Sequence, residues 1–468
     1  MVVRNRVTDL PSAEYTSHFL THRVVPAAAG PQRPLGFDDA RHALSQADLP
    51  PGAVVVIAVA DSLTQLTLFL AALHQDLVPV LLPRACPRQR IRLVADALGA
   101  GALVTPATAA GTRTRTPVAL TRWNAPRPQL HNPGQAIVMT SGTSGLASGC
   151  LHHVSSLLAN ARLHGNAIGL RSSDSLLVNL PLNYSFALVA QALAALALGA
   201  RLVLGGPPFG SSAYHHSLQH HGITVSSLSP SLVRTFLGDQ FTLPRSLRTL
   251  TVGGDALEAV HVRELLRRHR DGEVYLTYGL TEAGPRVSTL AAHREPPERH
   301  TSVGLPLPGV TTRIERLDPA RDEGELVVTT PTAMVRRVGS EPAGRRGLVA
   351  PGTIATSDVF HLDESGYLSF RGRLADFVLI NGDKVSLRWV RDLVGSLPGV
   401  LHVRTEIVRT PPTRSGSSGQ KYRLHVLATE ATDRLRARIE HRLKEVLLRV
   451  EFPCELLLTD EPSAAFTK

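Results

Sequence analysis

Met139-Thr140-Ser141-Gly142-Thr143-Ser144-Gly145-Leu146-Ala147-Ser148-Gly149-Cys150 is the stretch around which the chain is organised. It follows the apolar run 136–138, which predicts a buried strand. Between Thr140 and Gly149 it holds five hydroxyl residues and three glycines. Glycines let the backbone turn tightly and bring N–H groups close to a ligand, and hydroxyls add donors, so the stretch favours a phosphate-binding loop. The alternative is a flexible turn. A Walker A loop is excluded because no Gly-Lys-Ser/Thr ends the stretch.

The same stretch resembles the Thr-Ser-Gly-Thr-Thr-Gly-x-Pro-Lys-Gly signature of the adenylate-forming superfamily. That superfamily contains acyl-CoA synthetases, aryl-acid ligases, peptide-synthetase adenylation domains and luciferases. Gly149 matches, and so do six consecutive residues with one Thr-to-Ser change: Thr140, Ser141, Gly142, Thr143, Ser144 and Gly145. Ser148 stands where the family has a lysine that helps hold the departing pyrophosphate. The resemblance therefore implies a slower first step, or compensation by a neighbour such as Arg286.

Length and composition are those of a globular protein with more than one domain. The chain has 468 residues, which suits two or three domains, and 43% of them are hydrophobic. The net charge of +11 raises the question of nucleic acid, but the arginines are spread along the chain and no basic run is interleaved with aromatics. We therefore expect no nucleic-acid partner. The positive charge favours anionic partners such as ATP, CoA or an acidic carrier protein.

Cysteine spacing and the N-terminus predict a cytoplasmic protein. Cys86, Cys150 and Cys454 have no paired spacing, which favours a reducing compartment and disfavours a zinc site. Residues 1–6 lack the apolar segment of a signal peptide. The longest apolar run, 186–204, contains Gln, Gly and Arg, and it predicts a buried helix followed by a strand rather than a membrane span.

The first third of the chain alternates strands with helices. We expect strands at 53–60, 78–82 and 102–105, with helices at 63–73 and 90–98 between them. This alternation implies parallel crossovers and an α/β fold of stacked layers.

Two neighbouring segments have a different composition. Residues 111–128, rich in Thr, Arg and Pro, are predicted to be a connecting loop. A helix is expected at 155–168, with His152 and His153 as loop or helix-entry residues.

Aromatic residues follow the strand predicted at 176–182. In the family this segment faces the acyl pocket and usually carries a histidine, which is absent here. Tyr184, Ser185 and Phe186 are therefore the candidates for the substrate pocket. The alternative is that the two aromatics belong to the ordinary core.

Glycines end the strand predicted from residue 247. Gly253, Gly254 and Asp255 resemble the family's Gly-Gly-Glu, where backbone lies along the adenine. At the carboxyl end of a parallel strand, glycines permit close approach of a ligand. A simple turn is the alternative.

The string Tyr278-Gly279-Leu280-Thr281-Glu282 resembles the family's Tyr-Gly-x-Thr-Glu motif without a change. Tyr278 offers an aromatic face to a purine, and Thr281 a hydroxyl to phosphate. Glu282 supplies a hard oxygen to Mg²⁺, which prefers a carboxylate combined with phosphate oxygens. A lone Thr-Glu pair would more simply begin a helix. The whole string, placed after the Ser/Gly stretch in the family's order, favours the nucleotide site.

A second group of family motifs lies near the predicted domain boundary. Asp358 matches the family's Thr-Gly-Asp with Ser for Gly, which implies that it accepts hydrogen bonds from both ribose hydroxyls. Arg373 resembles the arginine of the hinge motif and would reach ribose or phosphate. We expect an N-terminal ATP- and acid-binding domain over 1–371 and a small, mobile α+β domain over 372–468. Lys468 keeps the spacing of the family's catalytic lysine, and its alternative is a disordered terminal charge.

The resemblance covers residues 50 to 468 and implies an AMP-forming acid–thiol ligase. A carboxylate would attack the α-phosphate of ATP with the help of Mg²⁺, and the thiol of CoA, or of phosphopantetheine on a separate acyl carrier protein, would then take the acyl group. An aryl acid such as a hydroxybenzoate is favoured. Two alternatives are a short or medium acyl acid and an amine acceptor. A third is a degenerate nucleotide-binding homologue, motivated by Ser148, Ala375 and Thr467.

Overall fold

The computed structural model describes residues 10–28, 34–83, 86, 88–107, 117–139, 148–205, 210–238, 242–316, 322–339, 347–374, 377–380, 383–409, 420–447 and 451–461. The chain divides into two compact units. The first unit comprises Met1–Thr356 and Phe360–Phe370, and the second comprises Ser357–Val359 and Arg371–Lys468. Among the described residues, none of the helices has the length and apolar character needed to cross a bilayer.

One sheet of the first unit contains the strands expected near the N-terminus. Its strands, in spatial order, are β17 (Arg336–Gly339), β7 (Ser148–His153), β6 (Gln135–Met139), β3 (Val78–Leu81), β2 (Val54–Ile57), β4 (Ala102–Pro106) and β5 (Val118–Arg122). β2 pairs in parallel with both β3 and β4, which confirms the predicted crossovers. β6 and β7 form an antiparallel hairpin.

A second sheet carries most of the predicted nucleotide motifs. Its strands, in spatial order, are β1 (Val24–Pro26), β9 (Arg201–Leu204), β8 (Ser175–Val178), β10 (Val225–Leu228), β11 (Thr249–Gly253), β12 (Glu273–Gly279), β13 (Arg286–Ala291) and β14 (Leu305–Pro306). The neighbouring strands from β1 to β12 pair in parallel. The pairs β12–β13 and β13–β14 are antiparallel.

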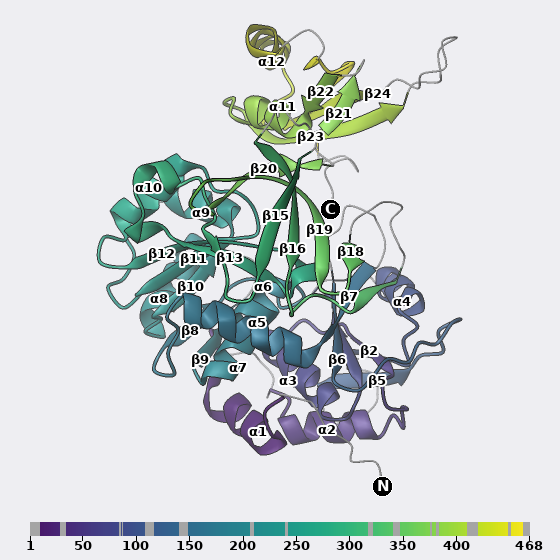
Figure 1. Ribbon diagram of the computed structural model, residues 1–468. Coiled ribbons are helices and arrows are strands. Elements are labelled where there is room, and N and C mark those ends of the chain that lie inside the picture. Colours follow the sequence, from purple (N-terminus) through teal and green to yellow (C-terminus); the bar gives the residue numbers. More distant parts are fainter. Residues whose placement is uncertain are drawn as a thin grey trace. The chain divides into compact units, whose positions relative to one another are not determined.

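Helices fill the space between these two sheets and cover their outer faces (Figure 1). Side chains alternate along a strand, so Val55 of β2 faces the middle layer while Val56 faces outward. The middle layer contains α3 (Ser62–Leu73), α5 (Val154–Ala167), η1 (Leu188–Leu193) and α7 (Ala194–Leu198), with α1 (Ala13–His22) and α2 (Phe37–Ser45) packed on the same core. The outer layers contain α4 (Arg88–Ala97) on one side, and α8 (Ser211–His220), α9 (Pro230–Gly238) and α10 (Ala259–Arg268) on the other. The predicted α/β class with stacked sheets is confirmed.

A third, largely antiparallel sheet completes the first unit. It contains β15 (Thr311–Arg316), β16 (Glu323–Thr329), β19 (Thr353–Leu362), β18 (Gly347–Ala350) and β20 (Leu368–Arg373). Short helical turns lie in the connections: α6 (Ser185–Ala187), η2 (Thr281–Ala283), η3 (Ala292–Arg294) and η4 (Pro297–Arg299). Residues 357–359 of β19 and 371–373 of β20 are assigned to the second unit.

The second unit is an α+β fold, as the sequence predicts. It contains the hairpin of β21 (Phe377–Ile380) and β22 (Asp383–Ser386), and a sheet of β23 (Val400–Arg409), β24 (Gln420–Ala428) and β25 (Glu455–Thr459). The helices α11 (Leu387–Gly395) and α12 (Asp433–Val446) share a buried core with β23 and β24.

Two local predictions were wrong. Residues 118–122 form the strand β5 inside the segment expected to be a loop, because its backbone pairs with β4 although its side chains are half exposed. His152 is not a loop residue: it lies in β7 and is fully buried, because β7 pairs with β6 on one side and β17 on the other. His153 does stand at the entry of α5.

Candidate functional site

The predicted phosphate loop joins the ends of β6 and β7. Thr140–Gly145 lies outside the described residues, but Met139 pairs with Gly149, so both ends of the loop leave the sheet at one place. Ser148 and Gly149 are already part of β7 rather than of the loop. A Cβ at Gly149 would lie 2.5 Å from Cγ2 of Ile137, so this position requires glycine for packing.

The glycines of the second sheet lie where two parallel strands end side by side. Gly253 of β11 pairs with Thr277 of β12, so residues 253–255 and 278–279 leave the sheet at the same edge. A Cβ at Gly253 would lie 2.4 Å from Oγ1 of Thr277, which explains the glycine. The carboxyl edge of a parallel sheet is the usual place for a bound nucleotide.

Tyr278 and Asp255 border this edge without contributing to the deep core. The Tyr278 ring packs edge-on against Phe360, with 4.7 Å between ring centroids. Asp255 is exposed, and its Oδ1 accepts a hydrogen bond of 2.8 Å from the N–H of Ala256. The adenine roles given to these residues stay predictions.

Thr281 and Glu282 form the short turn η2 directly after β12. The Thr281 hydroxyl lies 3.1 Å from the hydroxyl of Ser185, which joins the predicted phosphate residue to the predicted substrate pocket. The backbone N–H of Met334 donates to the carbonyl of Glu282 at 2.8 Å. The turn is thereby held from two sides.

Arg337 is a functional candidate that the sequence did not reveal. Its guanidinium forms an ion pair with the carboxylate of Glu282, and both side chains are mostly buried. Arg337 lies on β17 opposite Cys150, two positions from the Gly339 that pairs with Ser148. A cation from the neighbouring strand therefore stands beside β7, the strand in which Ser148 replaces the family's lysine.

Arg286, the neighbour suggested as compensation for Ser148, packs against the predicted acid pocket. Its guanidinium carbon lies 3.8 Å above the ring centre of Phe186, and the residue is buried at the start of β13. Burial lowers its pKa to about 9. Tyr184, by contrast, is 44% exposed, so of the two predicted pocket aromatics it is Phe186 that contacts buried charge.

His152 hydrogen-bonds to the turn formed by Thr281 and Glu282. Its Nε2 donates to the carbonyl of Thr281 at 2.9 Å. Burial, assisted by the neighbouring His153, lowers the pKa of His152 to about 4 against the opposing effect of backbone hydrogen bonds with Thr281 and Thr332. The imidazole is therefore neutral at physiological pH.

In the second unit, Asp358 and Arg373 are brought together. The Nε of Arg373 lies 2.9 Å from Oδ1 of Asp358, and the carboxylate is buried while the guanidinium is more than half exposed. Ser357, which stands where the family has glycine, has a φ of +58°, in the left-handed region that favours glycine. Lys468 and Ala375 lie outside the described residues.

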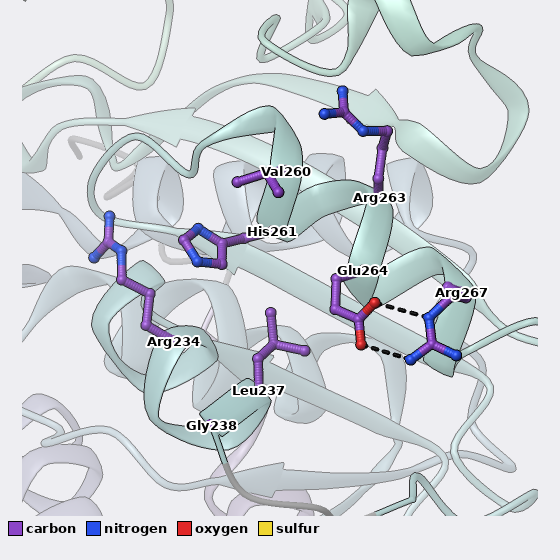
Figure 2. Close-up of a pocket in the computed structure, with 8 residues that line it drawn as sticks. All are labelled: Arg234, Leu237, Gly238, Val260, His261, Arg263, Glu264 and Arg267. Carbon is purple, nitrogen blue, oxygen red and sulfur yellow. Dashed lines mark hydrogen bonds and ion pairs between the residues drawn. The ribbon is translucent and has the colours of Figure 1, made fainter. Parts of the chain in front are cut away.

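A surface hollow lies away from these residues. It has a volume of about 610 Å³ and lies between α9 and α10 (Figure 2), where it is lined by Arg234, Leu237, Gly238, Val260, His261, Arg263, Glu264 and Arg267. Most of its charges are paired locally: Arg267 with Glu264 at 2.8 Å, and Arg234 with Glu258 at 2.7 Å. None of the predicted site residues lines it, and we do not assign the chemistry to it.

Comparison with known proteins defines the class. Residues 38–336 match the AMP-binding enzyme family, and the chain belongs to this family. Among named relatives, it is 28% identical over 270 residues to the 2-succinylbenzoate–CoA ligase of Bacillus mycoides, a match that covers 57% of this chain and 55% of the relative. The match thus spans about half the length of that curated relative.

Solved structures show the same fold. The o-succinylbenzoate CoA synthetase of Bacillus subtilis superposes with a TM-score of 0.74 in its acyl-adenylate complex, at 19% identity, over 91% of this chain and 88% of that one. Its complex with ATP and a magnesium ion gives a TM-score of 0.73 over 90% and 88% of the two chains. The amide bond synthetase of Marinactinospora thermotolerans gives 0.67 at 21% identity, over 90% and 89%.

Proposed function

We propose that this protein is an ATP-dependent ligase that activates a carboxylic acid as its acyl-adenylate and transfers the acyl group to the thiol of CoA. The observation that carries the proposal is the meeting of three segments of the first unit. The Thr281–Glu282 turn contacts Ser185 of the predicted acid pocket and Arg337 beside the predicted phosphate loop. Family membership supports the nucleotide, and the relatives named as CoA ligases support the acceptor.

In this proposal the ends of β11 and β12 hold the nucleotide. Gly253 and Gly254 let the adenine approach the backbone, and the face of Tyr278 covers the base. The hydroxyls and N–H groups of residues 140–145 bind phosphate oxygens. In the second unit, Asp358 takes the ribose hydroxyls, for which it must give up part of its pairing with Arg373.

The residues at the turn suit a magnesium ion bound together with phosphates. Mg²⁺ is commonly held by one or two carboxylates plus substrate phosphate oxygens, and Glu282 provides such a carboxylate beside the Thr281 hydroxyl. The ion would neutralise charge on the phosphates. In the structure the guanidinium of Arg337 is paired with the carboxylate of Glu282. The Nε of Arg337 has no partner among the described residues. We propose that Arg337, rather than Arg286, supplies the positive charge that Ser148 lacks.

The chemistry is a displacement at phosphorus followed by acyl transfer. A carboxylate oxygen of the acid forms a bond to the α-phosphorus, the bond from that phosphorus to the bridging oxygen breaks, and pyrophosphate leaves. The thiolate of the acceptor then attacks the acyl carbon, and AMP leaves. The protein positions the two reactants and stabilises the developing negative charge, through Thr281, Arg337 and Lys468.

The acid and the acceptor are the finer part of the proposal. An aryl acid is favoured because Phe186 lines the predicted pocket and the relatives' names contain a benzoate. CoA is the first acceptor to test, with a carrier-protein phosphopantetheine and an amine as the alternatives. We further propose that residues 1–371 bind ATP and acid, and that 372–468 form the small domain that contributes Lys468.

Trapping with hydroxylamine tests the proposal. The purified chain is incubated with ATP, Mg²⁺, hydroxylamine and a panel of aryl and acyl acids, and hydroxamate is measured beside pyrophosphate. We expect acid-dependent formation of both, reduced about 10²–10³-fold by E282Q. ATP binding without product from any acid would instead support a degenerate homologue. Product masses after adding CoA, carrier or amine then identify the acceptor.

A further inference from the structure

Arg286 is a buried cation that has no counter-charge among the described residues. It is 3% exposed, and its Nε and Nη2 have no hydrogen-bond partner in the described part of the chain. Burial lowers the pKa of the guanidinium only to about 9, so it stays charged at neutral pH. Arginine side chains are almost never fully buried unless they are paired. A charge in this position suits an anionic ligand.

The guanidinium lies among residues assigned to the candidate site. One face is covered by the ring of Phe186 at 3.8 Å, and the adjacent Ser185 contacts Thr281. A Cβ built at Gly253 would lie 3.0 Å from Nη1 of Arg286, so that nitrogen reaches the end of β11. The cation therefore lies between the predicted acid pocket and the strand end assigned to the nucleotide.

The backbone of Arg286 is held in place by a buried asparagine. Nδ2 of Asn160 donates to the Arg286 carbonyl at 2.9 Å, and the Arg286 N–H donates to Oδ1 of Asn160 at 2.9 Å. His164, one turn further along α5, is also buried, and burial together with the charge of Arg286 holds its pKa well below the usual value. His164 thus stays neutral, and Arg286 is the charged member of this pair. Because the backbone of Arg286 is held in place, less entropy is lost when an anion binds.

We propose that Arg286 binds a second carboxylate of the substrate, remote from the carboxylate that is activated, so that the enzyme selects dicarboxylic acids. The planar guanidinium matches a carboxylate with two parallel hydrogen bonds, and Nε and Nη2 of Arg286 have no partner among the described residues. This inference rests on the proposed function, since it deepens the assignment of the acid.

Two other anions fit this position less well. The reacting carboxylate needs a free lone pair to attack phosphorus. Two hydrogen bonds from a guanidinium would stabilise this carboxylate before the reaction and would slow its attack. The phosphates of ATP already have Thr281, Arg337 and Lys468 as proposed partners. A remote carboxylate, by contrast, keeps its charge through the whole reaction, so its binding energy is available for positioning the acid.

The selectivity follows because a bound monoacid leaves the buried Arg286 guanidinium without a partner. A site built to bond a polar group rejects an analogue that lacks it, because the buried partner stays unpaired. We therefore expect a dicarboxylic acid to be used with a kcat/KM at least about 10²-fold higher than the monoacid of matched size. Suitable pairs are terephthalate with benzoate and adipate with hexanoate.

The experiment compares R286M with the full-length wild-type chain. Methionine can stay packed on Phe186 but has no charge, so R286M should lose the preference for diacids over monoacids by about 10²-fold. R286K keeps the charge but lacks the planar guanidinium that forms two parallel hydrogen bonds. Its preference for diacids should lie between those of the wild type and R286M. R263M, at an exposed arginine of α10, is the matched control and should keep the wild-type preference.

Thermal unfolding supplies a readout that does not need catalysis. Without ligand, R286M should unfold at a higher temperature than the wild type because an unpaired buried charge is removed. Adipate should raise the unfolding temperature of the wild type and not that of R286M. If R286M unfolds earlier and keeps the diacid preference, Arg286 is structural and the inference is overturned.

The two proposals can also fail separately. An adipate shift that depends on Arg286, without hydroxamate from any acid, would support the binding site and refute the ligase. Hydroxamate from monoacids and diacids alike, unchanged in R286M, would support the ligase and refute the inference. Absence of any Arg286-dependent effect of adipate, on stability or on rate, refutes the inference whatever the activity.

Discussion

The neutral, buried His152 predicts a specific dependence of stability on pH. The folded state lowers the pKa of this imidazole from 6.5 to about 4. Between these two pH values the unfolded chain binds more protons than the folded chain. The free energy of unfolding therefore rises with pH through this window and decreases as the pH falls. The stabilisation is complete above pH 6.5 and is gone at about pH 4.

The size of the effect follows from the pKa difference. Lowering the pKa from 6.5 to about 4 corresponds to about 3 kcal/mol. The physical origin is burial, which removes water from the ring and thereby disfavours the charged imidazolium. The cost falls on the turn that carries Thr281, whose carbonyl accepts the hydrogen bond from Nε2.

The assay is urea unfolding of the wild type and H152Q between pH 7 and pH 4. The glutamine amide can still donate to the Thr281 carbonyl but does not titrate. We expect the wild type to lose about 3 kcal/mol more than H152Q over this range. Other titrating groups, such as the buried His164, contribute equally to both chains and cancel. Parallel pH curves for the two proteins would refute the reasoning, and H152N repeats the test if H152Q does not fold.

Three further predictions concern other positions. G253A places a Cβ 2.4 Å from Oγ1 of Thr277 and should cost about 1–3 kcal/mol of unfolding free energy, whereas G238A, with nothing within 4 Å, should change it by less than about 0.5 kcal/mol; equal effects would contradict the packing argument. At residue 357, where φ is +58°, S357G should be more stable than S357A by about 1 kcal/mol in urea unfolding, because both lose the hydroxyl and differ only in tolerance of that φ; a more stable alanine variant would exclude strain there. K468A should slow adenylate formation by about 10²–10³-fold and thioester formation from preformed adenylate far less, and equal losses in both half-reactions would contradict the role given to Lys468.

The central strands and helices could be predicted because their signals are local. Residues 54–57 and 78–81 are apolar runs bounded by turn residues, and they form adjacent parallel strands as expected. The strand β5 was missed because it is half exposed, and its Thr- and Arg-containing sequence lacks an apolar run. What makes it a strand is the hydrogen-bonding edge of β4, which is a tertiary effect.

The candidate site was predictable where its residues are consecutive. The string from Tyr278 to Glu282 carries its motif within a single strand and turn. Arg337 lies 55 residues beyond Glu282, and only the pairing of β17 with β7 brings it near. His152 was misread for the same reason, because its burial depends on strands from both sides. The placement of Arg286 on Phe186 likewise results from packing between α6 and β13.

The central claim is that a carboxylate oxygen attacks the α-phosphorus of ATP, and isotope transfer tests it most directly. The wild-type chain is given ATP, CoA and an accepted acid labelled with ¹⁸O in the reacting carboxylate, and the products are weighed by mass spectrometry. We expect AMP that carries one ¹⁸O atom, because the bridging oxygen of the acyl-adenylate stays with phosphorus when the thiol attacks. Unlabelled AMP, or label found in inorganic phosphate beside ADP, would contradict the account.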